Sequence, residues 1–222
     1  SFQLLDSNHE PISQTCWYPS RNILNTFTTD TTGTVTLPES LNPGTYYVRE
    51  VSSKKPYLIG EDLTITIPAD RYLTPVAIAS YFDDAATGSI EIVKSDATDG
   101  HNLMGAVFDI RAAGDIVRPD GSIVSLAGET VATVTTDEQG SASASHLSLG
   151  CGTACYEVVE TQAPEGYLLD QNPHTVELSY ADQTTPVIEA HLGVSDDFTK
   201  VDISKVDASG EQEVEGAQLT LY

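Results

Sequence analysis

Hydrophobic and polar residues alternate along much of the chain with a period of two. Residues 63–67, 90–94 and 176–180 all show this alternation, and they are rich in Val, Ile, Thr and Tyr. A period of two places successive side chains on opposite faces of an extended strand, and these residue types favour strands. No segment keeps apolar residues at helical spacing over three turns. The pattern predicts an all-β protein made of sandwiches, with turns rich in Gly, Pro and Asp.

Much of the sequence repeats with a period of about 110 residues, a normal size for one β-sandwich of the immunoglobulin-like type. The register predicts a first copy, 1–85, that lacks its first strand, and a complete second copy, 86–197. Residues 198–222 then correspond to the opening hairpin of a third, truncated copy. We interpret the chain as a window from a longer tandem array. The paired segments are 27–33 with 134–140, 46–50 with 156–160, 90–96 with 201–207, and 105–110 with 216–221.

The strongly negative net charge of the chain excludes some classes of binding partner. Asp and Glu number 33 against 10 Lys and Arg, which gives a net charge of −23. Nucleic acids and anionic membranes require a basic face, so neither is expected as a partner. No apolar run approaches the roughly 20 residues that span a bilayer, and the first residues lack the layout of a signal peptide. The hydrophobic content of 40% and the regular alternation predict a folded protein.

The three cysteines allow at most one internal disulfide. Cys151 and Cys155 are close enough in sequence to bridge a tight loop, and Cys16 lies far from both. From this spacing we expect a local disulfide ahead of two free thiols, which stay open as the alternative. A zinc site needs more ligands near Cys151 and Cys155 than His146 alone supplies. We therefore expect no metal and no cofactor.

The most specific stretch is residues 160–167, which read ETQAPEGY. It follows a strand that carries Lys94, a Gly-Ala-x-Phe segment at 105–108 and a Thr-Asp-x-x-Gly turn at 136–140. In this order the motifs resemble those of Cna B-type domains, also called SpaA-like or prealbumin-like domains, of Gram-positive surface pilins and adhesin stalks. The resemblance covers the second copy throughout and the first copy loosely, where residues 50–57 replace the ETxAPxGY form.

The resemblance implies a covalent bond between a lysine on the first strand and an Asn or Asp on the last, promoted by a glutamate on a strand between them. The matching residues are Lys94 and Glu160. The last strand, 186–197, contains no asparagine, and its alternation places Asp196 on the apolar face. Asp196 is therefore the first choice of acceptor and Asp197 the second. An aspartate acceptor releases water rather than ammonia.

The chemistry of such a bond is physically reasonable without an enzyme. An amine is nucleophilic only when neutral, and burial can lower the pKa of a lysine from about 10.4 to about 5–6. An apolar setting also keeps a glutamate protonated, so that it can hydrogen-bond the acceptor carbonyl and shuttle the proton. The bond forms once per chain, so we expect no catalytic turnover.

The partial copies contain unmatched parts of the same set. Glu50 lies in the first copy, with Asp83 and Asp84 at the end of the apolar segment 76–82, but the lysine strand is missing. Lys205 lies on a lysine strand without a sandwich. Either the window cuts through both copies, or the tail of one chain completes the first copy of the next.

These features predict a stalk or pilus-type module at the cell wall of a Gram-positive bacterium. Its partners would be other repeats of the same protein and a host ligand bound by a domain outside this chain. Two alternatives stay open: an adhesin whose own loops near Trp17 bind host glycan or matrix protein, and an accessory module of a secreted enzyme. For Trp17 itself we expect a role in the core or in anchoring a loop.

Overall fold

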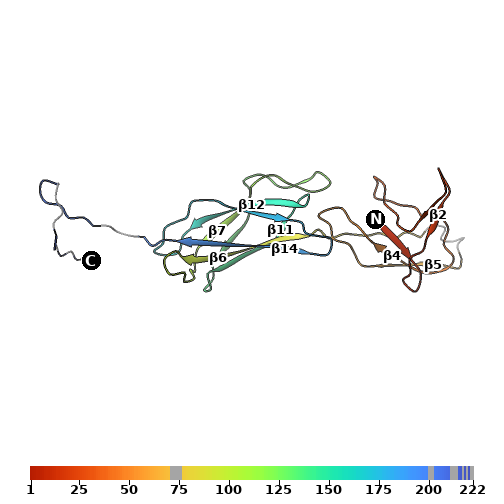
Figure 1. Ribbon diagram of the computed structural model, residues 1–222, viewed down its shortest axis with the longest axis horizontal. Helices are drawn as coiled ribbons and strands as arrows, with labels where there is room; N and C mark the ends of the chain where they lie inside the picture. Colours follow the sequence, from red (N-terminus) through yellow and green to blue (C-terminus); the bar gives the residue numbers. More distant parts are fainter. Residues whose placement is uncertain (71–76, 200–202, 211–214, 217, 219, 221–222) are drawn as a thin grey trace.

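The computed structural model describes residues 1–70, 77–199, 203–210, 215, 216, 218 and 220. Within these ranges the chain forms strands and no helix, so none of it could cross a membrane as a helix. The all-β prediction is confirmed. Figure 1 shows two bodies of sheet lying end to end along one axis, with the segment after the last strand continuing beyond the second body. We call residues 1–85 the first module and residues 86–197 the second module.

The second module is a sandwich of two sheets. One sheet has the strand order β10-β7-β12-β13 and the other the order β11-β6-β14. The buried apolar residues of the core cluster all come from residues 86–194. Alternation explains the packing, because each strand turns one set of side chains toward the other sheet. The strands are β6 (Thr87–Asp96), β7 (Val107–Ala112), β8 (Ile116–Val117), β9 (Ile123–Ser125), β10 (Thr130–Thr135), β11 (Ser141–Ser148), β12 (Thr153–Gln162), β13 (His174–Ser179) and β14 (Val187–Asp196).

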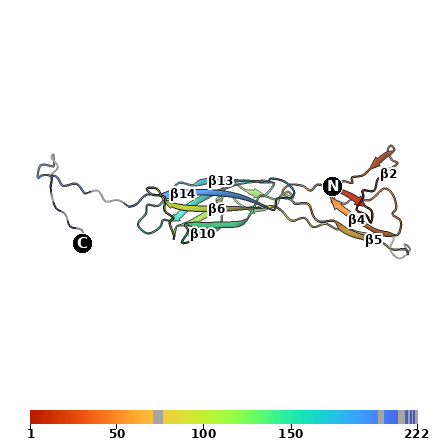
Figure 2. The same cartoon turned by 60° about the horizontal axis from the view of Figure 1, so that its bottom comes forward.

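The first and last strands of this sandwich lie side by side. β6 and β14 are parallel neighbours and stay in register over their whole length, from Val187 opposite Thr87 to Asp196 opposite Asp96. β6 is the central strand of its sheet, with β11 on its other side. Figure 2 shows β6 and β14 running together along the axis of the molecule.

The first module contains a counterpart of one sheet only. Its sheet has the order β1-β4-β5, and Phe2 pairs with Glu50 as Phe108 pairs with Glu160 in the second module. In the described residues no sheet corresponds to β11-β6-β14. The strands are β1 (Phe2–Leu5), β2 (Gln14–Cys16), β3 (Asn22–Leu24), β4 (Gly44–Glu50) and β5 (Leu63–Ile67).

Residues 77–82, the described part of the apolar segment before Asp83 and Asp84, form no strand. Val76 lies outside the described residues, and residues 77–84 have no regular pairing. The counterpart of this segment is β14, whose neighbour in the sheet is the lysine strand β6. Without such a neighbour, the backbone N–H and C=O groups of residues 77–82 have no ladder to join.

Direct contacts join the two modules. The N–H of Ile59 donates to the carbonyl of Gln183 at 3.0 Å, and the Gln183 side-chain amide donates to the carbonyl of Ser53 at 2.8 Å. The Lys55 ammonium lies 5.5 Å from the ring centre of Tyr180, within the range of a cation–π contact. These contacts order the connection, so the modules meet through packed groups as well as through the chain.

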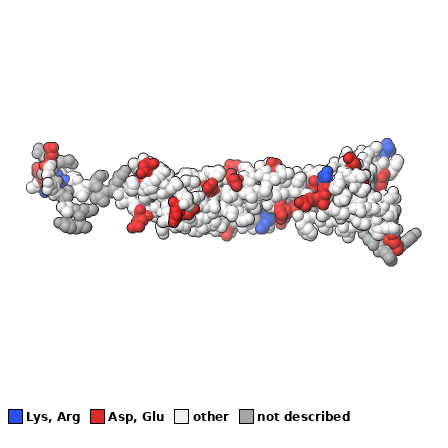
Figure 3. All heavy atoms as spheres, turned by 90° about the horizontal axis from the view of Figure 1, so that it is seen from below, with Lys and Arg blue, Asp and Glu red and all other residues white. Residues whose placement is uncertain are grey.

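Acidic side chains are distributed along the whole rod. Figure 3 shows red carboxylate groups over both modules, with few basic groups among them. Mutual repulsion of these charges disfavours close association of rods side by side.

Candidate functional site

A fully buried lysine lies between two carboxyl groups in the second module. Lys94 on β6 has no exposed side-chain surface, and the side chains of Glu160 on β12 and Asp196 on β14 are each 1% exposed. The Lys94 ammonium nitrogen, Nζ, is 3.0 Å from Glu160 Oε1 and donates a hydrogen bond to Asp196 Oδ1. The structure therefore brings together the three side chains that the sequence singled out.

Strand alternation explains why these side chains meet. On β14 the inward positions include Val194 and Asp196, as predicted, and Val194 lies opposite Lys94 in the parallel ladder. Asp196 is one inward position further along, so Lys94 reaches it diagonally on the same face of the sheet. Glu160 comes from the opposite sheet and closes the site from the other layer.

The surroundings of the site exclude water and shift the protonation of Glu160. Burial raises the pKa of Glu160, and this outweighs the lowering by the Asp170 N–H, which donates to Oε2 at 2.8 Å, and by Lys94. Nearby Asp196 raises the pKa further. The Phe108 ring centre is 5.6 Å from Lys94 Nζ and forms an apolar wall. The site thus holds one amine, one carboxyl group that favours its protonated form, and a second carboxyl group.

Asp196 and Asp197 differ sharply in position. Asp196 is buried, and its Oδ2 atom has no hydrogen-bond partner among the described residues. Asp197 is exposed, and its backbone carbonyl accepts a hydrogen bond from the Leu168 N–H at 3.0 Å. Asp196 is thus the aspartate that contacts the buried ammonium of Lys94.

The glycine of the Thr-Asp-x-x-Gly turn positions the backbone of Lys94. The Gly140 carbonyl accepts a hydrogen bond from the Lys94 N–H at 2.8 Å, and Gly140 has a φ of +68°. A Cβ atom at this position would lie 2.6 Å from the Lys94 carbonyl oxygen. Sequence reasoning identified this turn but not its contact with the lysine strand.

We expect Gly140→Ala to destabilise the second module more than Gly100→Ala does, as measured by urea denaturation. Both glycines have a positive φ, which costs an L-residue about 1–2 kcal/mol. A Cβ at Gly100 meets nothing within 4 Å, whereas a Cβ at Gly140 overlaps the lysine strand. The overlap adds about 1–3 kcal/mol, the usual cost of overpacking. Equal losses in the two variants would contradict this account of the turn.

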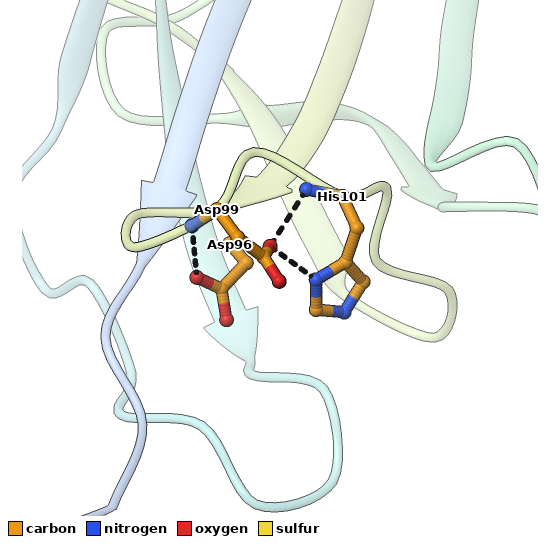
Figure 4. Close-up of side chains that lie close together, drawn as sticks. All are labelled: Asp96, Asp99 and His101. Carbon is orange, nitrogen blue, oxygen red and sulfur yellow. Dashed lines mark hydrogen bonds and ion pairs between the residues drawn. The ribbon is translucent and has the colours of Figure 1, made fainter.

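A second cluster, Asp96, Asp99 and His101, lies in the loop that follows β6 (Figure 4). Its members are held by hydrogen bonds of the loop itself. The Asp99 N–H donates to Asp96 Oδ1 at 3.1 Å, while the backbone N–H and ring Nδ1 of His101 lie 3.0 and 2.6 Å from Asp99 Oδ1. The Tyr167 hydroxyl donates to Asp96 Oδ2 at 2.9 Å. The cluster thus fastens the ETQAPEGY segment to the end of the lysine strand.

The first module repeats the acidic half of the buried site. The Gly60 N–H donates to Glu50 Oε2 at 3.1 Å, as the Asp170 N–H does to Glu160. The Leu58 N–H donates to the Asp84 carbonyl at 2.8 Å, as the Leu168 N–H does to Asp197. These matching bonds make Asp83 the counterpart of Asp196.

Glu50 and Asp83 lie near each other, and the N-terminal ammonium of Ser1 acts on Glu50 from nearby. Burial raises the pKa of Glu50, and the neighbouring Asp83 raises it further. No described lysine or arginine forms an ion pair with either residue. Lys205 is exposed and lies in the segment after the second module.

The structure differs from the sequence predictions for the cysteines and for a core position of Trp17. Cys16, Cys151 and Cys155 are all free. Cys155 belongs to β12, which is extended from Thr153 and advances about 3.3 Å per residue, so the local disulfide expected between Cys151 and Cys155 is not present. Trp17 is 70% exposed, so the expected role in the core is wrong, while a role in anchoring its loop stays a prediction.

The family model described as "SpaA: Prealbumin-like fold domain" matches residues 1–80 and 88–191. The two matched segments fall on the two modules. No curated protein sequence matches the chain.

Similar solved structures come from several bacteria. The Bacillus anthracis TIE protein is 20% identical over 89% of this chain and 34% of its own, with a TM-score of 0.53. The group B streptococcus pilus 2b backbone protein is 15% identical over 89% and 77%, with a TM-score of 0.40. The Bacillus cereus major pilin subunit BcpA is 22% identical over 73% and 41%, with a TM-score of 0.35. This chain thus spans about a third of the TIE protein's chain, and the likeness to that protein concerns the fold.

Proposed function

The chain belongs to the SpaA family of prealbumin-like fold domains, as its motifs predicted, and from this premise we propose that it is a stalk or pilus-type module of a Gram-positive cell-surface protein. We further propose that an isopeptide bond between Lys94 and Asp196 locks the second module. In this proposal residues 1–85 and 86–197 are successive repeats, and residues 198–222 begin a third. The last segment lies partly outside the described residues.

The observation that carries the proposal is the burial of Lys94 against two carboxyl groups. A buried ion is costly unless it is paired, and a dry setting disfavours separated charges. Burial raises the pKa of Glu160, which is the direction that the proposed mechanism needs for a proton-donating carboxyl group. Transfer of a proton from Lys94 to Asp196 leaves a neutral amine beside a neutral carboxylic acid, which is the reactive pair.

The bond-forming step is a balanced condensation. The lone pair of Lys94 Nζ attacks Asp196 Cγ, and Glu160 stabilises the developing charge on the carbonyl oxygen by donating a hydrogen bond. Glu160 then relays a proton from the nitrogen to the departing hydroxyl group. One C–N bond forms, one C–O bond breaks and one water leaves. The sandwich holds the two groups in contact, which supplies a high effective concentration.

The shape of the molecule supports the mechanical part of the proposal. Two modules lie end to end with direct contacts at their junction, and the acidic surface keeps the rod solvated. A covalent link that forms once and needs no cofactor suits a protein that works outside the cell at the wall. Other repeats of the same protein are its expected neighbours, and a host ligand would be bound elsewhere in the longer protein.

The test is the intact mass of the denatured, reduced chain. We expect the wild-type chain to be lighter than its sequence by one water, because the condensation releases one. Glu160→Ala should restore the full sequence mass, since it removes the proton relay. Asp196→Ala should do the same by removing the acceptor.

Two matched variants serve as controls. Glu157 lies on the same strand as Glu160 but on the other face, and Asp197 is the exposed neighbour of Asp196. Glu157→Ala and Asp197→Ala should both keep the loss of water. A wild-type chain with its full sequence mass would refute the bond, and loss of the bond in Asp197→Ala would move the acceptor to that residue.

A second candidate function rests on exposed aromatic residues of the first module. Trp17 and Tyr18 are 70% and 85% exposed in the loop between β2 and β3, and the Arg21 guanidinium lies 5.6 Å from the centre of the Trp17 ring. Such a surface suits a ligand-binding adhesin. Binding of host glycans or matrix proteins that is lost in Trp17→Ala would favour this function over a pure spacer.

A further inference from the structure

The two carboxyl oxygens of Glu160 have different surroundings in the buried site. The backbone N–H of Asp170 donates a hydrogen bond to Oε2 at 2.8 Å, whereas Oε1 lies 3.0 Å from Lys94 Nζ. Apart from this approach of the amine, Oε1 is buried with no hydrogen-bond partner among the described residues. A backbone donor therefore occupies one oxygen, and the other faces the reacting nitrogen.

The first module contains the same contact with a different residue. The Gly60 N–H donates to Glu50 Oε2 at 3.1 Å, and in both modules the donor lies ten residues after the glutamate. Glycine has no side chain in common with aspartate, so the backbone N–H is the feature that the two modules share. The path of the backbone, rather than the side chain of Asp170, places this donor on the buried carboxyl group.

The segment that leads to Asp170 is fixed to the ends of two strands. We call this segment, residues 163–170, the strap. The Tyr167 hydroxyl donates to Asp96 Oδ2 at the end of β6, at 2.9 Å. The Leu168 N–H donates to the carbonyl of Asp197, directly after β14, at 3.0 Å. The strap is thus tied to both strands that carry the reacting groups.

The side chain of Asp170 fixes the strap from its other end. Asp170 Oδ1 accepts a hydrogen bond from the Asn172 N–H at 3.0 Å, and Oδ2 lies 2.8 Å from Nε2 of His174, the first residue of β13. The Asp170 backbone is therefore held from both sides. Its N–H cannot turn away from Glu160 without breaking contacts of the strap or of this turn.

A donor at one oxygen determines where a neutral carboxylic acid carries its proton. Such an acid has one hydroxyl oxygen, which donates, and one carbonyl oxygen, which is the better acceptor. The Asp170 N–H at Oε2 therefore favours the form of Glu160 in which Oε2 is the carbonyl oxygen and Oε1 carries the proton. The opposite form would leave a buried N–H poorly satisfied, which is costly in a dry site.

We propose that Asp170 is a positioning residue for the isopeptide reaction, because its N–H fixes the proton of Glu160 on Oε1, the oxygen that faces Lys94. This inference rests on the proposed function. In the condensation, Oε1–H donates first to the acceptor carbonyl oxygen and then gives its proton to the departing hydroxyl group. Oε1 takes a replacement proton from the nitrogen, so Glu160 ends unchanged and one water leaves.

The test uses the full chain, assembled in denaturant by ligation at Cys151. Lys94 lies in one piece and Glu160 in the other, so the chain is free of the bond until it is assembled and folded. Ligation also allows the amide between Leu169 and Asp170 to be replaced by an ester. The ester removes the N–H and keeps both side chains.

Isotope-edited infrared spectroscopy reads the position of the proton. The sample is the Lys94→Met chain with an isotope-labelled carboxyl carbon at Glu160, at a pH where Glu160 is protonated. This variant has no amine at the site, so the measurement does not depend on the reaction. We expect the carbonyl stretch of Glu160 to move to higher frequency in the ester chain, because Oε2 loses a hydrogen bond. An unchanged frequency would overturn the proposal, since the carbonyl oxygen would then be Oε1.

The rate of water loss after dilution from denaturant, followed by mass at a series of pH values, reads the effect on the reaction. We expect the Asp170 ester to react about tenfold more slowly, the equivalent of one hydrogen bond. Its rate should also fall off at higher pH than that of the wild type. The N–H lowers the pKa of Glu160, so its removal keeps this residue protonated to higher pH. Lys94 and Asp196, which face Glu160 from β6 and β14, are the same in both chains.

Two controls disturb the strap and keep the Asp170 N–H. An ester at Leu168 removes the hydrogen bond to the Asp197 carbonyl, and Asp170→Ala removes the side-chain contacts. A loosened strap admits water, which lowers the pKa of Glu160, so neither control should fall off at higher pH than the wild type. An Asp170 ester that reacts at the wild-type rate, or falls off at lower pH, would overturn the positioning role. A wild-type chain that keeps its full mass would instead refute the proposed bond, and the infrared shift would still decide the position of the proton.

Discussion

Lys94→Met is expected to lower the melting temperature of the second module by roughly 20 °C. The proposed bond closes a loop between residues 102 apart, and by analogy with a disulfide such a link stabilises by about 4.7 kcal/mol. For a domain of about 100 residues, each kcal/mol corresponds to at least about 4 °C. Methionine keeps an unbranched apolar side chain, so the change removes the amine with little loss of packing. Differential scanning calorimetry measures the shift.

The control for this prediction is Lys205→Met, which removes an exposed lysine outside the sandwich. It should leave the transition of the second module unchanged. The wild-type transition should also persist in reducing buffer, because an amide does not respond to thiols. A Lys94→Met chain that melts with the wild type would show that the site contributes no covalent link and little net pairing energy.

Pulling the chain from its two ends should release far less length from the wild type than from Lys94→Met. The proposed bond would join the first and last strands of the second module, so tension would pass from Lys94 to Asp196 without unfolding the residues between them. In the variant these 102 residues can extend by up to about 350 Å, at about 3.3–3.6 Å per residue. Single-molecule force spectroscopy measures this step.

The first module provides an internal reference in the same recording. It has no described lysine at Glu50, so it should unfold and extend in both proteins. Asp197→Ala should behave as the wild type does. A long extension of the second module in the wild type would contradict a bond that carries the tension, whatever the melting temperature of the module.

Alternation predicted the positions of the buried side chains because a strand has only two faces. It placed Asp196 inward and Asp197 outward, and both positions are found. Alternation could not say which strands face each other across the sandwich. That Glu160 and Lys94 share one site came from the motif order of the family, whereas their placement on opposite sheets is seen only in the structure. Their reaction stays a prediction.

The features that could not be predicted depend on how strands are placed and paired, which a segment's own residues do not determine. Segment 76–82 has strand-like composition, but pairing requires a neighbour, and the neighbour is missing from the described first module. Sequence spacing likewise placed Cys151 and Cys155 within reach, although the extended start of β12 carries the second thiol away.

The parallel pairing of β6 and β14 also determines how successive modules of this kind are arranged along the chain. Two parallel terminal strands force the chain to enter at one end of the sandwich and to leave at the other. An antiparallel pair would return the chain to its starting side, and successive copies would fold back on one another. With the observed topology, every inserted copy moves its distal neighbour outward by a fixed increment. In the proposed stalk, the number of copies in the gene would therefore set the height at which the outermost domain stands.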